Sequence, residues 1–141
     1  MAMGYFKEAF GTFAPHTDRD AAVKFILDLV LADDRLDDLA NLLSISSKIG
    51  AIEGEPGWIL ERRKDHAIQS AYSAWPQYAG YRAFVDPTGY RLAFPQSFYT
   101  VQTFHQYVHA AVNVYVKHRP EHADAANNVL FLSQLTFPEH R

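Results

Sequence analysis

Two histidines one helical turn apart are the side chains of this sequence that most resemble a metal site. His105 and His109 have the i, i+4 spacing that places two imidazoles on one face of a helix, where both can bind one zinc ion. In zinc proteases a glutamate follows the first histidine and acts as general base, but Gln106 holds that position here. No acid lies near in the sequence to complete a ligand set. We therefore predict no metal, with a small histidine-based metal-binding protein or enzyme as the alternative.

The sequence patterns that announce other catalytic sites are missing. There is no nucleophile elbow, phosphate-binding loop or dinucleotide fingerprint, and Gly50, Gly54 and Gly57 do not have the spacing of a nucleotide-binding loop. The absence of cysteine excludes disulfides, thiolate metal ligands and a cysteine nucleophile. We predict no catalytic residue and no cofactor, and we expect that the protein is not an enzyme.

Acidic residues are concentrated in the first part of the chain. Residues 1–57 hold ten acids against five bases, whereas residues 58–141 hold six acids against eight bases. An acidic region repels nucleic acid and speeds the encounter with a basic protein. The densest cluster pairs like charges at i, i+4, which costs a few tenths of a kcal/mol per pair and is partly offset at a helix N-terminus. A capped, solvated helix face and a partner-binding surface explain this cluster equally well. It comprises Asp33, Asp34, Asp37 and Asp38, with Glu53 and Glu55 nearby.

Aromatic residues are the second feature that favours a binding surface. The chain has eight tyrosines, more than a small core requires, and exposed tyrosine and tryptophan are frequent interface anchors. Trp75 and Tyr78 lie together in a turn-rich segment. We therefore predict that the partner-binding residues are Asp33, Asp34, Asp37, Asp38, Glu53, Glu55, Trp75 and Tyr78.

The N-terminal third has the periodicity of two helices. Apolar residues at helical spacing predict a helix over about 18–31, and a shorter stripe from Leu36 to Leu43 predicts a second. The serine-, glycine- and proline-rich stretch 44–57 is expected to be a loop.

The middle of the chain changes to a strand-like pattern. Four short runs, 58–63, 66–74, 81–86 and 90–94, predict an antiparallel meander. The last two runs are joined by Asp-Pro-Thr-Gly at 86–89, a strong turn signal.

The last quarter predicts two further helices. Thr100 is a suitable N-cap for a long amphipathic helix, and Pro120 is suited to the first turn of a closing helix. The result is an α+β fold: N-terminal helices, a four-stranded antiparallel sheet, and two C-terminal helices packed on the sheet. A length of 141 residues predicts a single domain, 1–141. No apolar run approaches a membrane span and no signal peptide is recognised, so we expect a cytoplasmic protein with no membrane partner.

Several short motifs occur along the chain in a fixed order. They are a Tyr-Phe opening, an Ala-Val-x-Phe-Ile-Leu helix, Ile49 and Gly50, Trp58 opening a strand, Phe104 and Tyr107 in the long helix, Tyr115 near its end, and His-Arg-Pro-Glu at 118–121. This order of parts resembles the immunity proteins of bacterial contact-dependent growth inhibition, especially those paired with ribonuclease toxins. The resemblance covers most of residues 5–135. It implies an α+β protein that binds the C-terminal domain of one cognate toxin, contacts no nucleic acid directly and performs no chemistry. An unrelated regulatory interaction domain is a further alternative.

Overall fold

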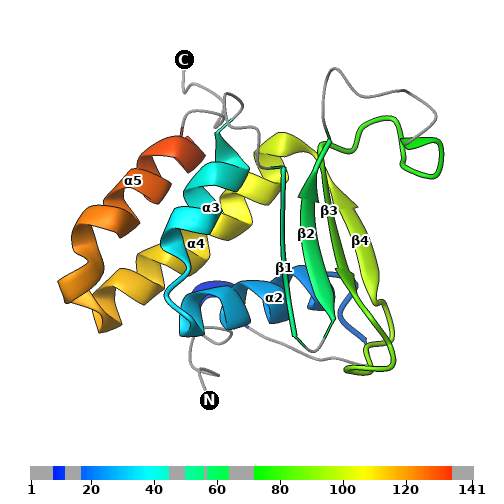
Figure 1. Ribbon diagram of the computed structural model, residues 1–141, viewed down its shortest axis with the longest axis horizontal. Helices are drawn as coiled ribbons and strands as arrows, with labels where there is room; N and C mark the ends of the chain where they lie inside the picture. Colours follow the sequence, from blue (N-terminus) through cyan, green and yellow to red (C-terminus); the bar gives the residue numbers. More distant parts are fainter. Residues whose placement is uncertain (1–7, 12–16, 45–49, 56, 64–71, 135–141) are drawn as a thin grey trace.

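The computed structural model describes residues 8–11, 17–44, 50–55, 57–63 and 72–134. Its elements follow the order helices, sheet, helices (Figure 1). Two helices, α2 (Ala21–Ala32) and α3 (Leu36–Leu43), come first; they are followed by strands β1 (Ala51–Gly54), β2 (Trp58–Arg62), β3 (Tyr81–Val85) and β4 (Gln96–Tyr99), and then by α4 (Val101–His118), the 3₁₀ turn η2 (Pro120–His122) and α5 (Ala123–Gln134). No helix within the described residues is both long enough and apolar enough to span a bilayer.

The sheet is an antiparallel meander in the order β1-β2-β3-β4. Its central strands alternate between buried and half-buried residues, which is the pattern of a sheet with one face in the core. Leu60 and Ala83 face the core, while their neighbours Glu61 and Arg82 form an ion pair on the opposite face. The predicted α+β class and four-stranded antiparallel sheet are confirmed.

Helix α2 packs between the sheet and α4, and this position explains why its sequence is apolar nearly all round. It packs on β2, β3 and β4 and also on α4, so two opposite sides of it are buried. In Figure 1, helices α3, α4 and α5 lie to one side of the sheet. α5 packs on α4 and α3, so the two C-terminal helices pack against each other.

One predicted loop and two predicted strands differ from the structure. The stretch 44–57 was expected to be a loop, but Ala51–Gly54 pairs with β2 as strand β1. The predicted strand 90–94 is wrong, because the fourth strand is Gln96–Tyr99. Its ladder begins where the Val85 amide donates to the Pro95 carbonyl. Of the predicted strand 66–74, residues 66–71 lie outside the described residues and 72–74 form a turn.

The caps and turns agree with the sequence more closely. The Thr100 hydroxyl accepts a hydrogen bond from the Thr103 amide, as expected of an N-cap. Pro120 opens η2, the turn that leads into α5. At the 86–89 turn the Gly89 amide donates to the Asp86 carbonyl.

Candidate functional site

The acidic cluster is built around the corner between α2 and α3. The Asp33 amide donates to the Leu29 carbonyl at the end of α2, and Asp34 then adopts a left-handed backbone with a φ of 56°. Aspartate tolerates this conformation better than most residues. Asp37 and Asp38 follow in the first turn of α3, where the helix dipole favours negative charge. Local structure therefore accounts for the placement of these four acids.

Arg35 connects this corner to the β1–β2 hairpin. Its Nε donates to Asp38 Oδ2 at 2.8 Å, and its Nη1 donates to the Glu53 carbonyl at 3.1 Å. The guanidinium also lies 5.4 Å from the ring centroid of Trp58, whose indole Nε1 donates to the Glu55 carbonyl at 2.9 Å. Asp38, Glu53 and Glu55, up to 17 positions apart in the sequence, are thereby gathered around one arginine. We call this region, with the exposed Asp33 and Asp37, the acidic end of the molecule.

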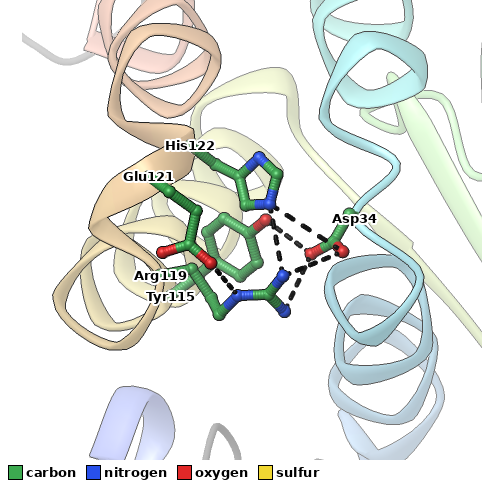
Figure 2. Close-up of polar contacts among 5 residues, drawn as sticks. All are labelled: Asp34, Tyr115, Arg119, Glu121 and His122. Atoms are coloured by element: carbon green, nitrogen blue, oxygen red, sulfur yellow. Dashed lines mark hydrogen bonds and ion pairs between the residues drawn. The ribbon is translucent and has the colours of Figure 1, made fainter.

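Asp34 points away from the acidic end, towards the corner between α4 and α5 (Figure 2). Its Oδ1 accepts a hydrogen bond from the Tyr115 hydroxyl at 2.7 Å and lies 3.3 Å from Arg119 Nη1. Arg119 also donates to Glu121 Oε2 at 2.9 Å, and its Nη2 lies 3.2 Å from His122 Nε2. The Tyr115 hydrogen bond, aided by the positive charge of Arg119, lowers the pKa of Asp34 below its usual value. The partly exposed Asp34 carboxylate is therefore engaged by contacts within the chain, which tie two helical corners together.

Trp75 and Tyr78 lie at the opposite end of the sheet from the acidic end. The Arg63 amide donates to the Gly80 carbonyl, and the Gly80 amide donates to the Tyr99 carbonyl, which fixes their segment beside the end of β2. The acidic hairpin instead joins the start of β2. Trp75 is half-buried, with its ring against Tyr72 and Phe98, whereas Tyr78 is 61% exposed. The structure thus gathers the acids and separates both predicted aromatic anchors from them.

His105 and His109 have different partners. His105 is buried in the core, with its Nε2 3.1 Å from the Tyr81 hydroxyl, and burial lowers its pKa to about 4. His109 Nδ1 lies 2.9 Å from the hydroxyl of Ser133, which itself donates to the Leu130 carbonyl. Within the described ranges, no group of three histidine, aspartate or glutamate side chains could hold a metal ion.

Asp86 is an additional acid that the sequence analysis treated only as a turn residue. Its Oδ1 accepts hydrogen bonds from the amide and the hydroxyl of Thr88, both at 2.9 Å, and these bonds lower its pKa. Its own amide donates to the Gly57 carbonyl at 2.7 Å, so it lies directly beside the β1–β2 hairpin. The Asp-Pro-Thr-Gly pattern predicts the turn, but only the pairing of β2 with β3 places Asp86 beside the β1–β2 hairpin.

No family model, no curated protein and no solved structure matches this chain. The chemistry of the site must therefore be inferred from its own geometry. A surface on which carboxylates gather suits electrostatic binding of a positively charged surface.

Proposed function

We propose that this protein is an immunity protein that binds the C-terminal domain of a cognate ribonuclease toxin and neutralises it by stoichiometric contact without any chemistry. The observation that carries the proposal is the acidic end, in which Arg35 holds the Asp38 carboxylate and the backbone of the acidic β1–β2 hairpin together, although these acidic residues are distant in sequence. The resemblance of the chain to toxin immunity proteins supplies the class of partner. Such a protein would act in the cytoplasm, where the toxin reaches its target.

The mechanism that we propose is steric and electrostatic. A ribonuclease must attract phosphates, so its active-site surface is basic. Carboxylates that project from a rigid corner and hairpin would occupy the positions of those phosphates and keep the substrate out. A stable complex of this kind buries about 1,600 Å² in total. Charge attraction contributes chiefly to the association rate, which should fall as salt rises.

The structure indicates which acids to neutralise. Asp37, Glu53 and Glu55 are exposed, and none of their carboxylates forms an ion pair with another residue in the described part of the chain. Asp34 is a poor choice, because its loss would disturb the contacts with Tyr115 and Arg119.

The test is the association rate of the chain with its cognate toxin domain, measured by stopped-flow mixing at low and high salt. The triple variant Asp37→Asn, Glu53→Gln, Glu55→Gln should associate at least tenfold more slowly at low salt, and the difference should shrink at high salt. Glu55→Gln alone is compared with Glu61→Gln, because Glu61 lies on the open face of the sheet and is paired with Arg82. Equal rates for wild type and triple variant at low salt would remove the acidic end from the interface. Absence of any complex with the toxin domain would refute the function itself.

A further inference from the structure

Two exposed aromatic rings lie in the connection between β3 and β4, beside the acidic end. Tyr90 and Phe94 are each 37% exposed. The Tyr90 amide donates to the Asp86 carbonyl at 3.1 Å, and the Asp86 amide donates to Gly57 of the β1–β2 hairpin. Backbone hydrogen bonds therefore connect the aromatic pair to the hairpin that carries Glu53 and Glu55, so acids and rings share one end of the sheet.

Tyr90 is held in place before any partner arrives. Its ring stacks on Phe25 of α2 with centroids 4.3 Å apart and planes inclined by 11°. A side chain that is already ordered loses little conformational freedom on binding, which favours it as an anchor. Tyr78, by contrast, is 61% exposed and stacks on no other ring among the described residues. It also lies at the far end of the sheet from the acids.

The neighbouring ring of Phe94 already binds a cationic side chain of the same chain. Arg19 places its guanidinium carbon 5.5 Å from the centroid of Phe94, a cation–π arrangement within the chain. Tyr90 offers an exposed aromatic surface of the same kind, and its backbone is bonded to Asp86, which is in turn bonded to the β1–β2 hairpin that carries Glu55. A cationic side chain from a partner would find both an aromatic surface and carboxylates there.

We propose that Tyr90 is the aromatic anchor of the toxin interface and receives a basic loop of the toxin, with an arginine or lysine lying across its ring and neighbouring basic side chains reaching Asp86 and Glu55. This inference rests on the proposed function and specifies the part of the partner that is recognised. It also assigns the anchoring role to Tyr90 instead of Trp75 and Tyr78. The occupant is a basic protein segment, because the carboxylates of the acidic end complement its charge.

The experiment measures the dissociation rate of the complex with the toxin domain for matched tyrosine variants. Tyr90→Ala should dissociate roughly tenfold faster or more, as is typical of an interface anchor, while Tyr90→Phe keeps the ring and should stay within about threefold of wild type. Tyr78→Ala makes the same truncation at the other end of the sheet and should leave the rate unchanged. If Tyr90→Ala loses its fold in a thermal melt, Tyr90→Lys replaces it, since a lysine stem can cover Phe25 while its charge repels a basic loop.

The two proposals fail in different ways. If the wild-type complex forms and the acid variants slow its association, but Tyr90→Ala or Tyr90→Lys dissociates at the wild-type rate, the anchor assignment is overturned and the function stands. If no toxin complex forms, the surface is tested with a ten-residue arginine peptide by amide chemical shifts at low salt. Shifts at Tyr90 and the β1–β2 hairpin that weaken in Tyr90→Ala would support the surface, and shifts centred on Tyr78 would overturn it.

Discussion

The buried carboxyl group of Asp28 should make a contribution to the stability of this protein that decreases as pH rises. This side chain of α2 is only 5% exposed, and its Oδ1 has no hydrogen-bond partner among the residues that the structure describes. Burial raises its pKa from the usual 3.8 to about 7. The unfolded chain loses this proton near pH 4, whereas the folded chain keeps it until about pH 7. The stability linked to the protonated carboxyl is therefore fully present below pH 4 and is lost as pH rises through 7.

The size of the effect follows from the two pKa values. One pKa unit corresponds to about 1.4 kcal/mol, so a shift of this size is worth about 4 kcal/mol, of which about 3 kcal/mol falls between pH 5 and pH 8. Asparagine has nearly the same shape and does not ionise. The free energy of unfolding of Asp28→Asn should therefore rise by about 3 kcal/mol relative to wild type between pH 5 and pH 8. At pH 5 the variant should be equal to wild type or weaker, because a buried amide also lacks partners.

Urea unfolding followed by circular dichroism at pH 5, 6, 7 and 8 measures this difference directly. Asp37→Asn is the matched control, because it makes the same chemical change on the exposed face of α3. Its free energy of unfolding should follow wild type across the series. Parallel curves for Asp28→Asn and wild type would refute the reasoning, since they would show that the Asp28 carboxyl ionises in the fold at no cost.

Three further perturbations test other parts of the structure. His105→Gln keeps a hydrogen-bonding group near Tyr81 but does not titrate near pH 4, so between pH 7 and pH 4 wild type should lose about 3 kcal/mol more than the variant in urea unfolding. Tyr115→Phe removes a hydrogen bond to a partly exposed carboxylate; it should cost about 1 kcal/mol in a thermal melt and raise the pKa of Asp34 measured by NMR titration. Gly54→Ala would place a Cβ 2.5 Å from the Trp58 indole, so it should destabilise the fold by about 1–3 kcal/mol and change tryptophan fluorescence.

The elements that local chemistry specifies were predictable from the sequence. The Thr100 cap, the Asp86 turn and the alternation in β2 and β3 each depend on residues close together in the chain. The short strands β1 and β4 were not found, because their pairing with neighbours defines them more than their composition does. β1 contains Gly54, which composition assigns to a loop, yet glycine is required there because the Trp58 indole lies so close.

The arrangement of the candidate site depended on contacts that a linear pattern does not contain. Asp34 bonds to Tyr115, 81 positions away, and this contact separates it from the other acids of its cluster. The acidic hairpin directly precedes β2 and Tyr78 lies shortly before β3, but the antiparallel pairing of these strands places the two at opposite ends of the sheet. Tyr90 was expected to lie in a strand, and only the structure shows it in a connection stacked on Phe25.

Asp28 and His105 have opposite effects on stability over nearly the same pH range. The stability associated with the protonated Asp28 carboxyl decreases between about pH 4 and 7 as pH rises. Because burial lowers the pKa of His105 to about 4, the folded chain resists its protonation, and stability decreases over that range as pH falls. Across this pH range each group changes the free energy of unfolding by about 3 kcal/mol, and the two changes have opposite signs, so they largely cancel in wild type. A wild-type free energy of unfolding that does not change with pH would therefore be no evidence against either pKa shift. The pH dependence due to one group appears only when the other group is removed. The free energy of unfolding of the double variant Asp28→Asn, His105→Gln should again be independent of pH.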